Sequence, residues 1–527
     1  MALVNNSLKE KLGTLYLCFM VVYMVVREVL PLNFLIDNIV ISIVIFLTGF
    51  ALVLWDLLTD RNCFNSKTVD FFAVFIIVAV VSSIVNYKYG VAENIKCIAA
   101  MVLECFVFFS VGFRHDGTKK FKLILNTLVV TVFIFNFISL GMYFFSIDYS
   151  IFFDYIRDQG FDTRWGRLMG IYNDPNVMCY VSLVAIFASA FFIKMHKTAW
   201  SFILNGINIL VQMTFVTLVL SRSATVVILV VPFLCVIYPF LCFIKENKKK
   251  AFVSLLAALL VSCALYGTTV IIKTGVPYVK VALLNEISVS AREKIVTAYD
   301  KLYIAGNIEI LNINENHTDL SNQQTGNDKG NNQDDPDSDH QNGDIDNPDS
   351  NQQDKYNPGN EPEKIERKDE KDDYSNGRFD RWKGGIEVFK TTPLLGTSPR
   401  NAIAIAKERT PNTVMGKYGW VTHCSYFEIL VNTGVLGALA LFGAFVYIAV
   451  CFIKTTSKKG FDISVFFAFL CFLAIAVGVF FVSDVFFVFT INSLLFFYLF
   501  GYLSSYAEND KKSTLNKLLE QFIFKNK

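Results

Sequence analysis

Long apolar runs separated by short polar connections dominate this chain. Most of these runs are about 18–22 residues long, and an α-helix needs roughly 20 apolar residues to cross a hydrocarbon core of about 30 Å. We therefore predict an all-α polytopic membrane protein with about twelve transmembrane helices. The predicted spans are 12–29, 38–57, 69–87, 95–113, 122–146, 176–193, 200–220, 224–244, 251–272, 426–453, 462–483 and 484–506.

The composition supports this class and excludes several others. Hydrophobic residues make up 53% of the 527 residues, charged residues make up 18%, and Phe occurs 51 times. Such a composition is not that of a soluble enzyme, a nucleic-acid-binding protein or a secreted disulfide scaffold. We expect the lipid bilayer as its surroundings and no nucleic acid as a partner.

The basic residues of the short connections predict the orientation, because cytoplasmic loops carry an excess of Lys and Arg. With the N-terminus inside, the cytoplasmic connections contain Lys9, Lys11, Arg61, Lys67, Arg114, Lys119, Lys120, Lys122, Lys194, Lys197, Lys245, Lys248, Lys249, Lys250, Lys454, Lys458 and Lys459. The short outer loops contain Arg27, Lys88, Arg157, Arg164, Arg167 and Arg222. We therefore predict a multi-pass cell-membrane protein with both termini in the cytoplasm.

This orientation divides the chain into four parts. Residues 1–272 form a membrane bundle of nine spans, with an outer cap at about 147–175 that we expect to be partly helical. Residues 273–425 form a large extracytoplasmic loop, whose start and end contain apolar periodicity and are expected to fold against the membrane. Residues 426–506 complete the bundle, and 507–527 form a basic cytoplasmic tail.

The middle of the large loop has a different composition. Residues 314–377 contain 18 Asp and Glu against 6 Lys and Arg, and only five hydrophobic residues. Such a segment cannot bury enough apolar surface to offset the entropy of ordering it, so we predict a disordered acidic insert. A calcium site is the alternative, but no fragment has the twelve-residue spacing that ends in Glu.

Candidate functional residues gather on the predicted outer side. They are Arg167, Arg222, Arg378, Arg381 and His423. Arg222 lies in a very short outer turn, against the positive-inside bias. If residues 377–382 are helical, the i,i+3 spacing places Arg378 and Arg381 on one face.

Arginines beside a histidine at an outer membrane face suit a phosphate-activated lipid substrate. Guanidinium groups bind pyrophosphate through paired charged hydrogen bonds and can stabilise it as it departs. A neutral histidine can take a proton from an attacking hydroxyl. The chain contains no glycine-rich phosphate loop, CxxC pair or HExxH motif, so we predict no metal and no cofactor.

Each residue also has a plainer interpretation. Arg167 could anchor to lipid headgroups, and Arg378 and Arg381 could lie on a solvated helix face. His423 could cap a helix, and Trp382 could pack rather than form a platform for a sugar.

Four blocks, in order, resemble the O-antigen ligase and polymerase family of bacterial envelope glycan assembly. They span roughly residues 160–450. Gly166–Asn176 is similar to the family's Arg-x-x-Gly-x-x-x-x-Pro-Asn entry to a membrane helix, and Leu220–Ala224 is similar to its Ser-Arg-Ser turn. Arg381-Trp382 with Pro393–Gly396 resembles a stretch late in the family's periplasmic loop. His423–Gly437 resembles its His-Asn-x-x-Leu…Gly-x-x-Gly block. Two departures stand out: Cys424 replaces the usual Asn, and the acidic insert lengthens the loop.

The resemblance implies a metal-independent, inverting glycosyltransferase of the membrane-embedded GT-C type. Its donor would be an undecaprenyl-pyrophosphate-linked oligosaccharide, used at the extracytoplasmic face, and its partners would include other polysaccharide-assembly proteins such as a flippase and a chain-length regulator. The implied catalytic residues are His423, Arg222 and Arg381. The implied substrate-binding residues are Arg167, Arg378, Asn176 and Trp382.

Two alternatives stay open at this point. A polymerase would join lipid-linked repeat units into a surface polysaccharide, whereas a ligase would transfer the glycan to another envelope acceptor; we favour the polymerase because no segment resembles a protein-acceptor module. A flippase for the same lipid-linked oligosaccharide would also suit twelve spans. The cations, however, gather on one face, and no internal repeat of the kind seen in many transporters is visible.

Overall fold

The computed structural model describes the chain except for residues 1, 37, 60–65, 115–117, 153–155, 163–165, 245–246, 306–374, 376, 509–513 and 515–527. Nearly all of the predicted acidic insert, 314–377, lies outside the described residues, as does most of the predicted basic tail, 507–527. Their predicted disorder and location stay predictions.

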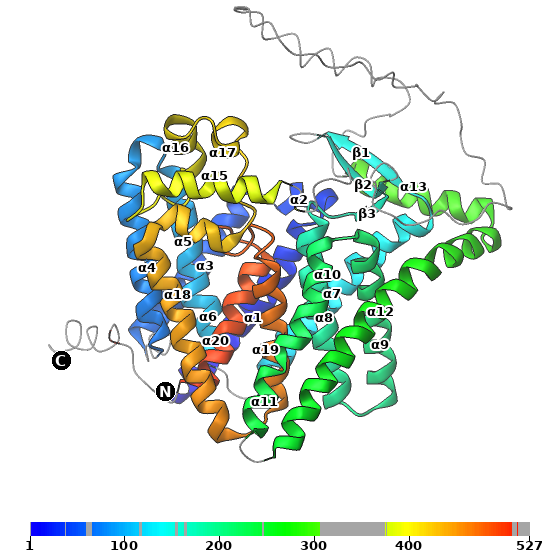
Figure 1. Cartoon of the computed structure of the whole chain (residues 1–527). Coiled ribbons are helices and arrows are strands. Elements are labelled where there is room, and N and C mark those ends of the chain that lie inside the picture. The colour runs from blue at the N-terminus through cyan, green and yellow to red at the C-terminus, as the bar shows by residue number, and fades with distance from the viewer. Residues whose placement is uncertain are drawn as a thin grey trace, which may run out of the picture.

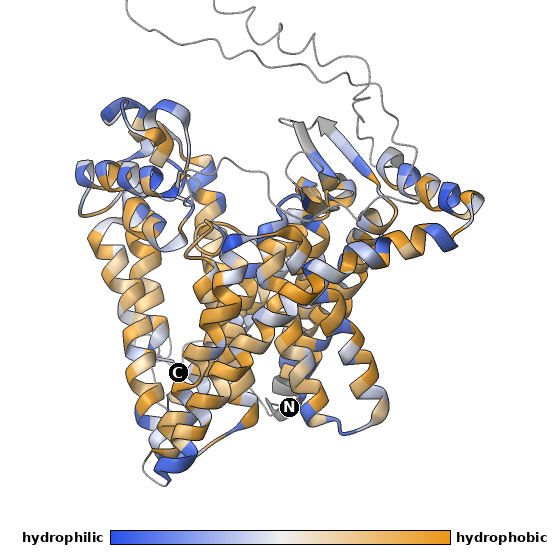
Figure 2. Ribbon diagram, turned by 45° about the vertical axis from the view of Figure 1, so that its right-hand side comes forward, coloured by the Kyte–Doolittle hydropathy of each residue, from blue (hydrophilic) through white to orange (hydrophobic). Residues whose placement is uncertain are grey.

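Long apolar helices form the body of the protein (Figures 1 and 2). In the first half of the chain they are α1 (Ala2–Arg27), α3 (Ile39–Leu58), α4 (Thr68–Val85), α5 (Ala92–Leu103), the π-helical turn Glu104–Phe108, α6 (Phe109–Phe113), α7 (Thr118–Phe144), α8 (Pro175–Met195) and α9 (Ala199–Val219). In the second half they are α10 (Arg222–Cys235), α11 (Ile237–Phe243), α12 (Lys248–Glu286), α18 (Ser425–Lys459), α19 (Ile463–Gly478) and α20 (Ile491–Ala507).

The all-α polytopic fold class is confirmed. Within the described residues, nine helical segments are long and apolar enough to cross a membrane. The three other predicted spans coincide with α1, α19 and α20, so the count of twelve stays a prediction. The predicted boundary at 483/484 is wrong, because α19 ends at Gly478 and α20 begins only at Ile491, with a non-helical segment between them.

The outer cap at 147–175 is not helical, which corrects our prediction. It is an antiparallel sheet with the order β1 (Asp148–Phe152), β2 (Ile156–Asp162) and β3 (Arg167–Gly170). Gly160 and Gly170 have positive φ angles of 84° and 64°, which a continuous helix does not allow. The sheet inserts Phe161 against Tyr143 of α7, with ring centroids 5.0 Å apart.

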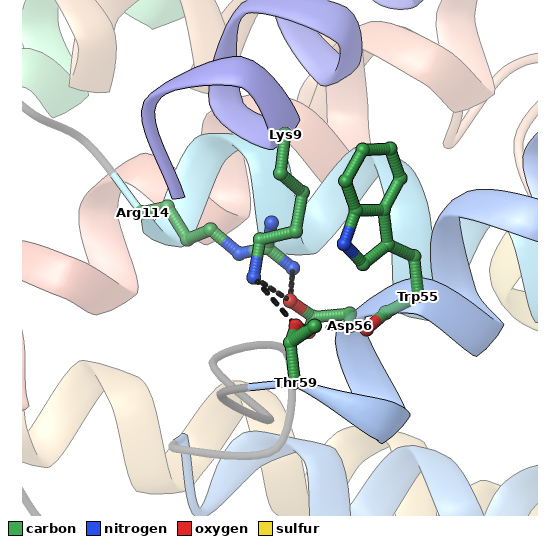
Figure 3. Close-up of polar contacts among 5 residues, drawn as sticks. All are labelled: Lys9, Trp55, Asp56, Thr59 and Arg114. Carbon is green, nitrogen blue, oxygen red and sulfur yellow. Dashed lines mark hydrogen bonds and ion pairs between the residues drawn. The ribbon is translucent and has the colours of Figure 1, made fainter. Parts of the chain in front are cut away.

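Buried ion pairs fix the helix ends on the face where α1 begins and α20 ends (Figure 1). Figure 3 shows Asp56, near the end of α3, between Lys9 of α1 and Arg114 after α6. The Lys9 Nζ–Asp56 Oδ1 distance is 2.8 Å, and these side chains are 2% and 1% exposed. On the same face, Glu508 accepts hydrogen bonds from Ser66 and Thr68 at the start of α4.

Short helices cover the opposite face (Figure 1). They are α2 (Leu30–Ile36), α13 (Val289–Ala305), α15 (Arg378–Thr391), α16 (Ala402–Arg409) and α17 (Val414–Tyr418). The last three share a small core of their own, in which Val388, Ala406 and Met415 pack with Val431 of α18. This core seats α15 over the start of α18.

Candidate functional site

A break in α18 joins two of the blocks identified in the sequence. Gly434 has φ 62° and ψ −165°, which is non-helical. The break leaves the carbonyls of Val431 and Asn432 available, and they accept hydrogen bonds from the N–H groups of Thr397 and Ser398 at 2.9 and 3.0 Å. A Cβ at Gly434 would collide with the backbone of Leu394, so glycine is required for this approach.

His423 lies in the short connection between α17 and α18. Its φ of 47° is in the left-handed region, which a non-glycine residue rarely adopts and which often marks a functional position. The next turn is fixed by Ser425, whose N–H donates to the carbonyls of Val479 and Val482 at 3.0 and 3.1 Å. The chain two residues after His423 is thus tied to the non-helical segment that follows α19.

Arg378 and Arg381 lie on the first turn of α15, so the helix on which their shared face depends is present. The Arg381 guanidinium carbon lies 4.5 Å from the centroid of the Trp420 ring, and that of Arg378 lies 5.8 Å from the centroid of Phe481. Arg381 Nε is buried without a hydrogen-bond partner among the described residues. A donor in that state is suited to a ligand with acceptor oxygens.

The two arginines act on the titration of His423. Burial, and after it the charges of Arg381 and Arg378, lower the pKa of His423 from 6.5 to about 4, while the carboxylate of Asp174 opposes them. Burial and the neighbouring Arg378 also lower the pKa of Arg381. These interactions place His423, Arg381, Arg378 and Asp174 in one cluster, in which the imidazole is neutral at physiological pH.

Arg167 and Asn176 adjoin this cluster through Asp174. The Arg167 Nη2 group donates to Asn176 Oδ1 at 3.2 Å, and Asp174 Oδ1 accepts from the Asn176 backbone N–H at 2.8 Å and from its Nδ2 at 3.0 Å. Asp174 is the N-cap of α8, where a carboxylate is favoured by the helix dipole. Arg167 itself ends up at the start of β3, 9% exposed.

Arg222 is the first residue of α10, after Leu220 in the left-handed conformation (φ 50°). Ser221 caps the helix, and its Oγ lies 3.0 Å from that of Ser223. The hydroxyl of Tyr180 donates to Ser223 at 2.7 Å, and Tyr180 also interacts electrostatically with Arg378 and Asp174. This chain of polar groups links the Arg222 turn to the cluster.

Trp382 packs among aromatic rings, as one of the two sequence interpretations expected. It stacks on Phe427 at 5.4 Å and meets Phe379 and Phe480 edge-on, each at 5.5 Å. Its Nε1 is buried without a hydrogen-bond partner in the described part of the chain.

The cluster therefore contains His423, Arg381 and Arg378 at its centre, with Arg167 and Asn176 alongside. In the sequence, Asp174 stands out only as a part of the block Gly166–Asn176, and Trp420 belongs to none of the four blocks. Both acquire their place from tertiary contacts between α8, α15 and the segment before α18. Where the structure describes the chain, no three His, Cys, Asp or Glu side chains lie close enough to hold a metal ion.

A comparison with protein-family models matches part of the chain. Residues 209–442 match a family model described as O-antigen ligase. The match begins within α9, ends within α18, and includes Arg222, Arg378, Arg381, Trp382 and His423. A search of curated proteins gives no match.

Proposed function

We propose that this chain, whose residues 209–442 match a family model described as O-antigen ligase, is a membrane glycosyltransferase that polymerises undecaprenyl-pyrophosphate-linked oligosaccharide repeat units. The product would be a surface polysaccharide such as a capsule, an exopolysaccharide or O-antigen, made at the outer face of the cytoplasmic membrane. The observation that carries this proposal is the cluster of two guanidiniums and a neutral imidazole.

The arginines would hold the donor. Arg381 and Arg378 lie one helical turn apart on α15, so both guanidiniums can reach one pyrophosphate. The orphaned Arg381 Nε would gain an acceptor oxygen. Because these groups are held in place by aromatic rings, they would stabilise the charge that develops as the pyrophosphate leaves, without rearranging.

His423 would serve as the general base. The acceptor hydroxyl would attack the anomeric carbon of the donor sugar, its proton would pass to the imidazole, and the bond from that carbon to the pyrophosphate oxygen would break. Attack opposite the leaving group inverts the anomeric configuration. The proton would then pass to water at the outer face.

The low pKa of His423 suits a base whose strength depends on the donor. Burial and two arginines lower that pKa to about 4, which keeps the imidazole free to accept a proton but makes it a weak base. A bound pyrophosphate would offset the arginine charges, and the pKa would rise toward the working pH. The base would thus be strengthened only when the donor is in place.

Complementation in the native strain tests the proposal. Wild type is compared with His423→Ala, Arg222→Ala and Arg381→Ala at matched membrane levels, and the exposed Lys383→Gln on α15 serves as the control. The readout is the size distribution of envelope polysaccharide together with the lipid-linked repeat units.

Loss of long chains, with single lipid-linked units still reaching the outer face, is the expected result for a polymerase. Long chains retained on the lipid carrier would point to a ligase instead. Wild-type polymer from all three variants would refute the assignment of these residues, and accumulation of repeat units inside the cell would favour a flippase.

A further inference from the structure

Trp420 and Tyr418 form an exposed pair of aromatic rings beside the candidate site. Their ring centroids lie 5.2 Å apart, at an interplanar angle of 33°. Trp420 is 47% exposed and Tyr418 is 56% exposed, so both rings are accessible to a ligand. We call these two residues the aromatic platform. It lies at the end of α17, on the face that the short helices cover (Figure 1).

Gly419 turns the chain between the two rings of the platform. It is the residue after α17 and has φ 69°, in the left-handed region that favours glycine. Its N–H donates to the carbonyl of Met415 at 3.0 Å, which closes the end of the helix. Met415 is 1% exposed and packs with Val388 and Ala406 in the small core under α15, α16 and α17. The platform is therefore an exposed surface on a fixed support, and a ligand would bind it with little loss of conformational entropy in the protein.

The platform adjoins both parts of the candidate site. His423, the proposed base, follows Trp420 by three residues in the same connection between α17 and α18. Arg381, a proposed donor ligand, comes from α15, and its guanidinium carbon lies 4.5 Å from the centroid of the Trp420 ring. A ligand on the platform would thus be close to the groups that carry out the proposed transfer.

Exposed aromatic rings with a hydrogen-bond donor beside them suit a sugar ring. The C–H groups on one face of a pyranose are apolar and pack on an aromatic ring, while its hydroxyls need polar partners. Lys417 can be such a partner, because its Nζ lies 5.1 Å from the centroid of the Tyr418 ring and an ammonium group donates to hydroxyl oxygens. The platform therefore combines an apolar surface for the ring with a donor for the hydroxyls.

Trp382, the residue that the sequence suggested as a platform for a sugar, is less accessible. Its ring is only partly exposed, and three phenylalanine rings pack against it at 5.4–5.5 Å between centroids. Both tryptophans lie near the same arginine, since Arg381 precedes Trp382 in the chain and lies over Trp420. The difference in exposure favours Trp420 for stacking on a sugar.

We propose that the aromatic platform binds the terminal sugar of the acceptor glycan, whose ring stacks on Trp420 and Tyr418 and whose attacking hydroxyl is held at His423. This inference rests on the proposed function for the identity of the ligand as a glycan. The acceptor is favoured over the donor because the platform and the base share one connection, whereas the donor's pyrophosphate is assigned to the arginines of α15. Arg381 lies over the Trp420 ring, so the indole separates that guanidinium from a sugar stacked on its other face.

Membrane anchoring is the alternative role for these two rings, because Trp and Tyr are enriched at membrane–water interfaces. An anchor holds the protein at the interface without contacting a glycan. Loss of an anchor would therefore leave the affinity for a sugar unchanged, whereas loss of a platform would lower it.

Transfer kinetics with separate donor and acceptor test this assignment on the full-length protein in nanodiscs. The donor is the lipid-pyrophosphate-linked repeat unit. The acceptor is a labelled methyl glycoside of the same repeat unit, which has no pyrophosphate and so cannot act as a donor. KM is measured for each substrate at a saturating concentration of the other. The variants are Tyr418→Ala, Trp420→Ala and Trp420→Phe, and the matched control is Trp200→Ala, at a tryptophan that is 73% exposed at the start of α9.

Tyr418→Ala should raise the KM for the acceptor about tenfold, equivalent to about 1.4 kcal/mol, and leave the KM for the donor and kcat unchanged. Trp420→Ala should raise the acceptor KM at least as much, and Trp420→Phe, which keeps a ring, should recover most of that loss. Because Trp420→Ala also removes the ring over which Arg381 lies, it alone should raise the donor KM as well. Trp200→Ala should match the wild type.

Two results would overturn the proposal. A rise in the donor KM without a rise in the acceptor KM would assign the platform to the donor's sugar. An acceptor KM that is unchanged in both alanine variants, or that rises equally in Trp200→Ala, would leave the two rings as membrane anchors.

Saturation-transfer-difference NMR on the same preparations separates this inference from the proposed function, because it detects binding of the methyl glycoside whether or not the protein transfers it. Binding that is lost in Trp420→Ala and kept in Trp200→Ala, without transfer by the wild type, refutes the proposed function alone. Transfer by the wild type with undiminished binding in Trp420→Ala and Tyr418→Ala refutes the platform alone. Neither binding nor transfer in the wild type contradicts both.

Discussion

The charges around His423 predict opposite shifts of the pH–rate profile in two variants. In the wild-type protein the pKa of His423 is about 4, against an ordinary value of 6.5. Arg381 is the larger of the two arginine contributions, and Asp174 acts against both. Arg381→Gln should therefore raise the pKa, and Asp174→Asn should lower it.

The size of the pKa shift in each variant follows from the order of the causes that lower the pKa of His423 in the wild-type protein. Burial is the largest cause and persists in both variants, so Arg381→Gln should bring the pKa only part of the way from about 4 back to 6.5. A base works in its deprotonated form, and one pH unit above its pKa it is about 90% neutral. Near pH 5 the wild-type rate should thus be close to its plateau, while that of Arg381→Gln should already be falling.

The assay is kcat/KM for glycan transfer against pH, which reports the free enzyme. Each profile is scaled to its own plateau, because Arg381→Gln will also weaken donor binding. Lys383→Gln removes an equal charge from the exposed side of the same helix and should leave the acid limb unchanged. The reasoning is refuted if Arg381→Gln and Lys383→Gln have the same acid limb, or if Asp174→Asn moves the limb to higher pH.

Two predictions concern stability. Asp56→Asn takes the carboxylate away from the buried Lys9 and the partly buried Arg114, and it should lower the free energy of unfolding by about 3–5 kcal/mol. Glu408→Gln, in a solvent-exposed pair, should change this free energy little. Thermal unfolding in detergent compares the two variants, and equal midpoints would contradict the burial argument. Gly434→Ala forces a Cβ into the backbone of the neighbouring loop and should lower both the unfolding midpoint and transfer activity, while Gly206→Ala, with open space around it, should not. An unaffected Gly434→Ala protein would show that the break in α18 is not required.

The hydrophobic pattern was sufficient to predict most helices, because a membrane helix satisfies its own backbone and needs only a long apolar run. The prediction of helices from hydropathy was wrong at residues 479–490. That segment is as rich in Phe and Val as the helices beside it, so hydropathy continues through it although the backbone does not. The hydrogen bonds from Ser425 that hold it are contacts between segments far apart in the sequence, which hydropathy does not encode.

The prediction of a partly helical outer cap was wrong for a different reason. Its strands are only four to seven residues long, and Gly160 in β2 and Gly170 at the end of β3 have positive φ angles. Mixed aromatic and charged residues suit a surface helix as well as a sheet with one covered face, so composition did not separate the two.

The candidate site was predictable in part. The positive-inside pattern placed the arginines and His423 on one side, and the i,i+3 spacing placed Arg378 and Arg381 together. Asp174 and Trp420 required the fold. Asp174 reads as an ordinary helix cap in the sequence, and only the approach of α8 to the α17–α18 connection gives its charge an effect on His423.

The most direct test of the central claim is a transfer assay with the purified protein and a single glycan substrate, the lipid-pyrophosphate-linked repeat unit. Because that unit would be both donor and acceptor, a polymerase should produce a ladder of longer lipid-linked chains without any added metal. His423→Ala should form the ladder about 10²–10⁴ times more slowly, the loss typical for a general base. A ladder from His423→Ala at the wild-type rate, or no product from the wild-type protein, would contradict the account.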